Sequence, residues 1–253
     1  MLEINYCQIN MKTFSFFSAK GGTGKTTFNM LFASYLSYVK GQRVFFLDFD
    51  APEYNCFFTR DRELKAGAAS EGLYEICCVE DQSRQNIANI SAMLKSLEGE
   101  VDYVIMDFPG SFNKSDAVCQ LALSGAIDLV VIPVDLDEIT LNSGKALSQT
   151  LAEFGQNSFL FFNRVQWQHK QEVYAALTKW FADKGIKVSD NQIKATAMLT
   201  RDSDKKTFMR STVTFPTKAV ESRNPNIINL FEEVIGYEGT KAKGDPDAGH
   251  KRL

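Results

Sequence analysis

One glycine-rich segment constrains this chain more than any other part of it. It lies between an apolar run, Thr13–Ser18, and an amphipathic run, Phe28–Val39. Its sequence is Lys20-Gly21-Gly22-Thr23-Gly24-Lys25-Thr26-Thr27. Glycines allow the backbone N–H groups of such a loop to turn inward around a phosphate, and the helix that follows adds its own unpaired N–H groups. The order of strand, glycine loop and helix therefore predicts a phosphate-binding loop.

Two side chains of this loop are expected to supply chemistry. Lys25 is placed to reach the β- and γ-phosphates of a nucleotide, and the Thr26 hydroxyl is placed to bind Mg²⁺. The nucleotide is expected to contact the rest of the loop as well: Gly21, Gly22, Thr23, Gly24 and Thr27. The alternative is a strand–helix turn without a ligand, but Gly-Lys-Thr in this order and between these flanks favours a site for ATP and Mg²⁺.

The rest of the chain alternates apolar runs with helical patterns. The apolar runs are continuous, as in parallel strands covered on both faces: Thr13–Ser18, Val44–Leu47, Tyr103–Met106, Leu129–Ile132 and Phe159–Phe162. The helical patterns are Thr26–Val39, Ser83–Leu97, Ser115–Ser124, Glu138–Phe154 and Lys170–Lys184. A glycine stands at or just past each helix end, where a left-handed residue is expected: Gly41, Gly99, Gly125, Gly155 and Gly185. This alternation predicts an α/β fold with a doubly wound, mainly parallel sheet and helices on both faces.

Three parts of the chain are expected to differ in organisation. Residues 1–10 form an N-terminal extension without the features of a signal peptide, and residues 11–237 form a single domain. Residues 238–253 are polar and lack an apolar period, which predicts a disordered tail. Residues 60–80 fit two interpretations, either a helix followed by a strand at Tyr74–Val79 or an excursion that faces a partner.

The start of the loop departs from the common phosphate-loop pattern. Ala19 stands where that pattern has glycine, and Lys20 directly precedes the first Gly-Gly pair. The segment thus resembles the deviant Walker A motif of the ParA/MinD family of P-loop ATPases, K-G-G-x-G-K-T-T, and the resemblance extends to about Gly236. It implies an ATP-dependent homodimer in which Lys20 reaches the nucleotide of the partner and takes part in catalysis with Lys25.

Acidic residues follow two of the predicted strands. Asp107 ends the run Tyr103–Met106, which is the Walker B pattern, and is expected to orient Mg²⁺. Asp48 and Asp50 follow Val44–Leu47 and resemble the D-x-D element of the family. The resemblance implies that Asp50 positions the attacking water and that Asp48 lies in the outer shell of the metal. The alternative for each is a cap on the next helix.

Two further elements resemble the base pocket of the family. Asn163-Arg164, after Phe161-Phe162, is similar to the strand-end pair that contacts adenine, and Pro216 is expected on the other side of the base. Glu53 departs from the family, because a carboxylate near the γ-phosphate would repel it and slow hydrolysis. The order Ala51-Pro52-Glu53 is most similar to the ParA (Soj)-like branch, and within it to the TraA type of conjugative transposons.

Charge is distributed unevenly along the chain. Between Arg164 and Arg223 there are twelve Lys or Arg and six Asp or Glu, whereas the whole chain has a net charge of −3. Two interpretations stay open, a solvated mixed surface or a patch that binds DNA without sequence preference. On the second, the preferred contacts are Lys205, Lys206 and Arg210.

Composition excludes some classes of protein. The five cysteines make neither a disulfide framework nor a C-x-x-C metal clip, which is typical of reduced thiols in the cytoplasm. No apolar run approaches the roughly 18 residues of a membrane span. The tail also lacks the amphipathic membrane helix of MinD-like members, so no membrane contact is expected.

Together with the resemblance to the ParA/MinD family, these observations imply a cytoplasmic, Mg²⁺-dependent ATPase that dimerises on ATP. Its role would be DNA partitioning, conjugative transfer or cargo positioning, together with a partner protein that the sequence does not identify. One alternative is a nucleotide-gated regulator with negligible hydrolysis, which Glu53 favours. Another is a metabolic or metal-cluster enzyme on the same fold, although the cysteines lack convincing spacing for a cluster.

Overall fold

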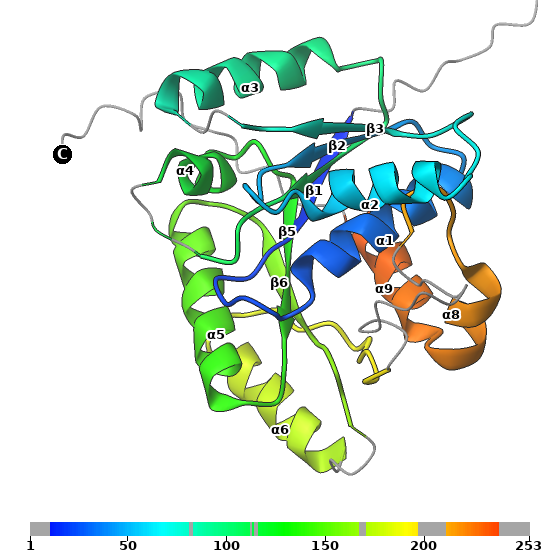
Figure 1. The fold of residues 1–253 in the computed structure, drawn as a ribbon. Coiled ribbons are helices and arrows are strands. Elements are labelled where there is room, and N and C mark those ends of the chain that lie inside the picture. The colour runs from blue at the N-terminus through cyan, green and yellow to red at the C-terminus, as the bar shows by residue number, and fades with distance from the viewer. Residues whose placement is uncertain are drawn as a thin grey trace, which may run out of the picture.

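Six parallel strands form the central sheet in the computed structural model of the chain (Figure 1). The structure describes residues 11–80, 83–111, 113, 116–166, 171–196 and 211–237, and only the backbone of residues 84–88. The strand order is β3-β2-β4-β1-β5-β6. The strands are β1 (Lys12–Phe16), β2 (Val44–Asp48), β3 (Glu75–Cys78), β4 (Tyr103–Asp107), β5 (Leu129–Val134) and β6 (Ser158–Phe162).

Helices cover both faces of this sheet because the strands are apolar on both sides. One face is covered by α1 (Lys25–Tyr38), α2 (Asn55–Lys65), α8 (Thr217–Arg223) and α9 (Asn226–Ile235). The other is covered by α3 (Arg84–Ser96), α4 (Ala117–Leu123), α5 (Glu138–Glu153) and α6 (Gln171–Ala182). Strands β2, β4 and β5 are buried along their whole length, as expected for a parallel sheet between two helical layers.

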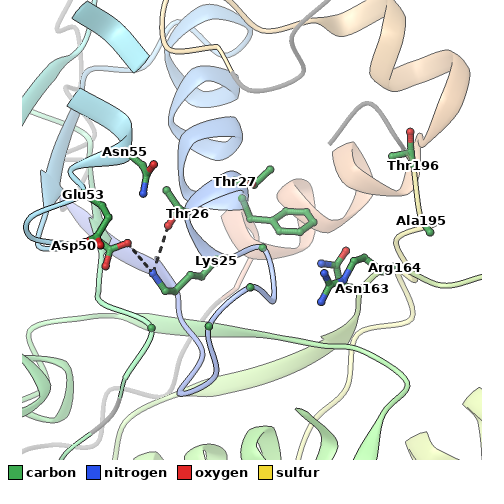
Figure 2. A pocket seen from close by; sticks show the side chains of 15 residues that line it. Lys25, Thr26, Thr27, Asp50, Glu53, Asn55, Asn163, Arg164, Ala195 and Thr196 are labelled. Carbon is green, nitrogen blue, oxygen red and sulfur yellow. Dashed lines mark hydrogen bonds and ion pairs between the residues drawn. The ribbon is translucent and has the colours of Figure 1, made fainter. Parts of the chain in front are cut away.

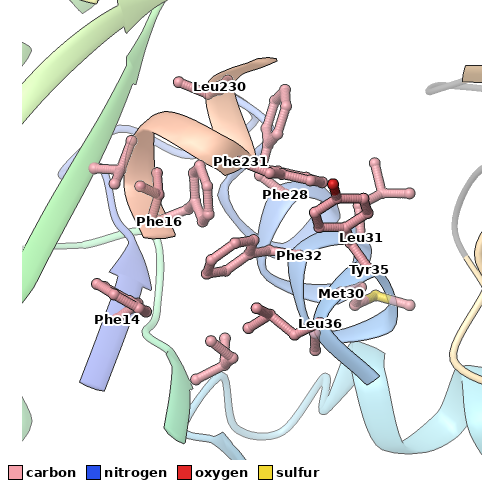
Figure 3. Close-up of a cluster of buried hydrophobic side chains, with 14 of the residues drawn as sticks. Phe14, Phe16, Phe28, Met30, Leu31, Phe32, Tyr35, Leu36, Leu230 and Phe231 are labelled. Carbon is pink, nitrogen blue, oxygen red and sulfur yellow. The ribbon is translucent and has the colours of Figure 1, made fainter. Parts of the chain in front are cut away.

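Aromatic side chains fix α1 against the sheet (Figure 3). The ring of Phe16, at the end of β1, stacks on Phe28 at 5.5 Å and meets Phe32 edge-on at 5.7 Å. Phe161 of β6 and Phe231 of α9 also meet it edge-on, at 6.1 and 6.0 Å. Each such pair contributes about 0.5–1.5 kcal/mol beyond its buried area. Strand β1 and helix α1 are therefore held rigidly, and the glycine loop joins them.

The strand order places the loop where ligands bind in such folds. β1 lies between β4 and β5. The connection that follows β1 leads toward β2 on one side of it, and the connection that follows β4 leads to β5 on the other side. Open parallel sheets bind ligands at the carboxyl ends of the strands at such a switch point. Asp48 and Asp107 pair in register at the carboxyl ends of β2 and β4. Both carboxylates therefore lie at the same edge of the sheet, beside the end of β1.

The fold class predicted from the sequence is confirmed, and all described strands are parallel. Every predicted strand and helix is present, with ends that differ by at most two residues. Within residues 60–80, the end of α2 and strand β3 confirm the helix-plus-strand interpretation. The predicted glycines all have left-handed φ angles: Gly41, Gly99, Gly125, Gly155 and Gly185.

Some features were not predicted or lie outside the description. Helices α8 and α9 were not predicted. The predicted extension, residues 1–10, and the predicted tail, residues 238–253, lie outside the described residues. None of the described helices is both long enough and apolar enough to cross a membrane.

Candidate nucleotide site

The glycine loop owes its path to two left-handed residues. Gly22 and Gly24 have φ angles of +78° and +99°, which residues with a Cβ rarely adopt. Gly24 is also the N-cap of α1, and its carbonyl accepts the first helical bond from Phe28 N–H at 3.0 Å. A Cβ on Gly24 would lie 3.0 Å from Nδ2 of Asn163. Both backbone angle and space therefore require glycine at this position.

A pocket of about 750 Å³ opens above the loop. It is lined by Gly21, Gly22, Gly24, Lys25, Thr26, Thr27, Phe28, Asp50, Glu53, Asn55, Gly110, Asn163, Arg164, Ala195 and Thr196. Figure 2 shows two ends of this pocket, with Lys25 and Asp50 at one and Asn163 and Arg164 at the other. The sequence predicted most of this lining but missed Phe28, Asn55, Gly110, Ala195 and Thr196, which carry no motif of their own.

Lys25 is the cation at the loop end of the pocket. Its side chain is 7% exposed, and Nζ lies 3.3 Å from Oδ2 of Asp50. Nζ also donates a hydrogen bond of 3.4 Å to the hydroxyl of Thr26 (Figure 2). Lys25 therefore contacts both the residue predicted to bind Mg²⁺, Thr26, and the residue predicted to position the attacking water, Asp50. A phosphate at this end would compete with Asp50 for the charge of Lys25.

Asp107 lies buried beneath the loop. Its Oδ1 accepts a hydrogen bond of 2.7 Å from Nδ2 of Asn29, a residue that the sequence did not single out. Its Oδ2 is buried and has no hydrogen bond of standard geometry with the described residues, although the Thr26 hydroxyl lies near the carboxyl. Burial raises the pKa of this carboxyl to about 7, against the opposing effects of the Lys25 ammonium and the Thr26 hydroxyl. An unpartnered buried oxygen next to a lysine is a position that a metal or its bound water would satisfy.

Asp48 is committed to the backbone. Its Oδ1 accepts from Asp50 N–H and its Oδ2 from Cys56 N–H, both at 3.2 Å. These bonds cap the start of α2 and hold the turn that carries Asp50, which agrees with the helix-cap alternative. Burial raises the pKa of Asp48, and these N–H groups oppose the rise. A role in the outer shell of a metal stays a prediction for this residue.

The donor set fits Mg²⁺ and not a soft metal. Mg²⁺ takes one or two carboxylates together with phosphate and water oxygens, and Thr26, Asp107 and Asp48 offer only oxygen. Across the described chain, no three His, Cys, Asp or Glu residues converge as a metal site. The described cysteines, Cys56, Cys77, Cys78 and Cys119, are free thiols.

The far end of the pocket is built from the end of β6. Asn163 is buried, and its Nδ2 donates to the carbonyl of Thr23 in the loop at 2.8 Å. Its Oδ1 finds no hydrogen-bond partner within the described chain. Arg164 has a left-handed φ of +50° and pairs with Asp135, its Nε donating to Oδ1 at 2.9 Å. Asn163 therefore ties the loop to β6 and keeps one oxygen free for a ligand.

Pro216 is not part of the pocket lining. It is the N-cap of α8, and its neighbour Phe215 packs on Tyr35 in the core at 5.1 Å. Ala195 and Thr196 line the pocket near Arg164 instead (Figure 2). The predicted contact of Pro216 with a base thus has no support in this geometry.

Lys20 and Glu53 both lie at the surface. The side chain of Lys20 is exposed and forms no ion pair with another described residue, and its carbonyl accepts from the hydroxyl of Thr23 at 3.3 Å. Glu53 is exposed and lines the pocket. This position agrees with the expectation that its carboxylate lies near the γ-phosphate. The predicted DNA contacts Lys205, Lys206 and Arg210 lie outside the described residues.

A glycine loop at a switch point, with a lysine, a threonine and buried carboxylates beneath it, defines a nucleotide-binding α/β domain. The CbiA family, the CobQ/CobB/MinD/ParA nucleotide binding domain, matches residues 14–208. The chain belongs to this family. No curated protein sequence matches the chain.

Solved structures of similar fold include proteins of the MinD and ParA groups. MinD in a MinC:MinD cell division complex from Aquifex aeolicus has a TM-score of 0.63 and 17% identity, over 90% of this chain and 97% of that one. A putative plasmid partition protein from Borrelia burgdorferi B31, bound to AMPPNP, has 0.59 and 18%, over 88% and 98%. pNOB8 ParA bound to nonspecific DNA has 0.57 and 17%, over 89% and 97%.

Proposed function

We propose that the protein is a cytoplasmic, Mg²⁺-dependent ATPase that dimerises on ATP and acts in DNA partitioning, conjugative transfer or cargo positioning. One observation carries the proposal above all others. Lys25, Thr26 and Asp50 are in contact at one end of the pocket, and the unpartnered Oδ2 of Asp107 lies buried in the same site. This arrangement has a cation for phosphate, oxygen donors for Mg²⁺ and a carboxylate for water.

The residues of the pocket divide the work of hydrolysis. Bound ATP and Mg²⁺ would supply the phosphoryl group and part of the charge that stabilises its transfer. Loop N–H groups and Lys25 would bind and orient the phosphates, while Thr26 and Asp107 would hold the metal. Asp50 is freed when phosphate takes over the charge of Lys25, and its carboxylate then accepts a hydrogen bond from the attacking water. Asn163 offers its free oxygen to an amino group of the base.

The exposed position of Lys20 supports the proposed dimer. An exposed loop lysine without an ion pair in the described chain is available to a second copy. In the proposed dimer, each Lys20 contacts the phosphates bound by the other protomer and adds positive charge where negative charge develops. This explains why the loop carries a lysine that does not enter its own pocket.

A phosphate-release assay tests the proposal directly. Wild type should release phosphate from ATP only with Mg²⁺, and Lys25→Ala should not release it. Light scattering with a slowly hydrolysed ATP analogue should show a dimer for the wild type. A molar mass that does not change when nucleotide is added would reject the dimer. An absence of phosphate release, both with and without DNA, would reject the ATPase.

The second candidate is a nucleotide-gated regulator with negligible turnover. The position of Glu53 in the pocket lining favours it, because its charge would oppose the γ-phosphate. ATP-dependent dimerisation without measurable phosphate release would support this candidate over the first.

DNA and an unidentified protein are the proposed partners. The pNOB8 ParA structure contains nonspecific DNA, and the segment Arg164–Arg223 has a surplus of six positive charges in this chain. Binding through phosphates makes log K fall with log salt by roughly 0.9 per contact. Replacing Lys205 and Lys206 together should make the slope shallower by about two units if both bind phosphate. A dimer without salt-sensitive DNA binding would leave a protein as its cargo.

A further inference from the structure

Asn29 is a polar residue on an apolar face of α1. It follows Lys25 by four residues, so both side chains leave the helix on the same side. Its neighbours on α1, Phe28, Leu31 and Phe32, are all core residues. Asn29 itself is 0% exposed. Burial of an amide is costly unless its hydrogen bonds are satisfied, so its partners indicate its purpose.

The amide of Asn29 has three hydrogen bonds. Oδ1 accepts from the N–H of Phe16 at 2.7 Å, and Nδ2 donates to the carbonyl of Phe16 at 2.9 Å. The second N–H of Nδ2 goes to Oδ1 of Asp107 at 2.7 Å. The orientation of the amide is unambiguous, because the reverse would set its oxygen against a carbonyl and a carboxylate. Asn29 thus joins the end of β1 to the end of β4 immediately beneath the loop.

Because of the third bond, the two oxygens of Asp107 have different surroundings. Oδ1 is held by the amide, and Oδ2 is buried with no hydrogen bond from the described residues. A carboxylate held at one oxygen has a fixed plane, so the direction of its other oxygen is fixed too. Two bonds to Phe16 would already satisfy the helix-to-strand connection. The second N–H of the buried amide also needs an acceptor, and that acceptor is a carboxylate oxygen of the site and not another backbone carbonyl.

We infer that Asn29 is a positioning residue, which holds Oδ1 of Asp107 so that Oδ2 is presented to the magnesium ion or to its bound water. The inference rests on the proposed function and adds a residue to it. Metal-binding carboxylates are commonly oriented by such an outer hydrogen bond, and its loss costs about 10–100-fold in metal affinity. Asn29 does not itself line the pocket, so its effect on the metal would pass through Asp107, whereas an effect on the loop would pass through Phe16.

The chain offers a matched control on the same helix. Ser34 is also 0% exposed, and its hydroxyl donates a hydrogen bond of 2.6 Å to the carbonyl of Ser211. Ser34→Ala removes a buried hydrogen bond of α1 far along the helix from Asp107. Asn29→Ala removes the bond to Asp107 as well. Comparing these two variants separates a loss of stability from a loss of metal positioning.

The experiment is a calorimetric titration of ADP into each protein, once with excess Mg²⁺ and once with EDTA. The dissociation constant in EDTA divided by the dissociation constant with Mg²⁺ measures how much the metal strengthens nucleotide binding. Asn29→Ala should reduce this ratio by about tenfold and leave the affinity in EDTA unchanged. Ser34→Ala should change neither quantity. Asn29→Leu keeps roughly the side-chain volume but has neither donor nor acceptor, so it should reproduce the loss if Asn29→Ala does not fold.

Each other outcome rejects a stated part. A wild-type ratio of one would overturn the proposed Mg²⁺-dependent site and this role with it. A wild-type ratio well above one that survives in folded Asn29→Ala or Asn29→Leu would overturn the role of Asn29 alone. An equal loss of affinity with Mg²⁺ and with EDTA would show that Asn29 only supports the loop through Phe16.

Discussion

Replacing Asp107 by asparagine should stabilise the nucleotide-free protein at neutral pH, although it removes a proposed metal residue. Burial raises the pKa of Asp107 from an ordinary 3.8 to about 7. Below pH of about 4 both folded and unfolded chains keep this proton, so the carboxyl costs nothing. Between about pH 4 and 7 the unfolded chain ionises first, and the wild-type free energy of unfolding falls. The cost at pH 8 is about 4 kcal/mol, at 1.36 kcal/mol per unit of pKa.

Urea denaturation in EDTA, without nucleotide, measures this cost. The quantity of interest is the free energy of unfolding of Asp107→Asn minus that of the wild type, followed across the pH range. At the acidic end, where Asp107 is protonated in both states, this difference reports only the replacement of a carboxyl by an amide and serves as the baseline. The difference should then grow by about 4 kcal/mol toward pH 8. A difference that stays constant within about 1 kcal/mol across the pH range would refute the raised pKa of Asp107.

Three other substitutions test the site. Lys25→Ala should lower ATP affinity by about 100-fold through loss of charged hydrogen bonds, and wild-type affinity in calorimetry would place the site elsewhere. Lys20→Ala should keep the affinity of the monomer for nucleotide but prevent the ATP-dependent dimer; a dimer of normal mass in light scattering would make Lys20 an ordinary surface residue. Glu53→Gln should raise phosphate release about fivefold by removing roughly 1 kcal/mol of repulsion, and an unchanged rate would mean that Glu53 does not face the phosphate.

The sheet and the loop were predictable because their signals are local. Continuous apolar runs such as Val44–Leu47 predict strands covered on both faces, and the glycine loop next to β1 needs no distant residue to be recognised. Helix α9 also carried a readable signal, since Ile227, Leu230, Phe231 and Val234 follow a helical period.

The rest of the site depends on contacts that sequence spacing does not reveal. Asn29 lies 78 positions before Asp107, and only the pairing of β2 with β4 and of β4 with β1 brings their side chains together. Its one visible signal is an amide on an apolar helix face. Ala195 and Thr196 have no such signal at all. Pro216 lies outside the pocket lining, and its position before a helix is explained by the start of α8.

The closeness of Gly110 to the loop has an evolutionary consequence. A Cβ on Gly110 would lie 3.1 Å from Cα of Gly21, so any side chain there would push the backbone of the loop by a few tenths of an ångström. Two segments almost ninety positions apart are thus limited by each other's shape and not only by their ligand. Because the close contact is with the backbone of position 21, no substitution at position 21 relieves it. Position 110 should therefore remain glycine in relatives that keep this path of the loop.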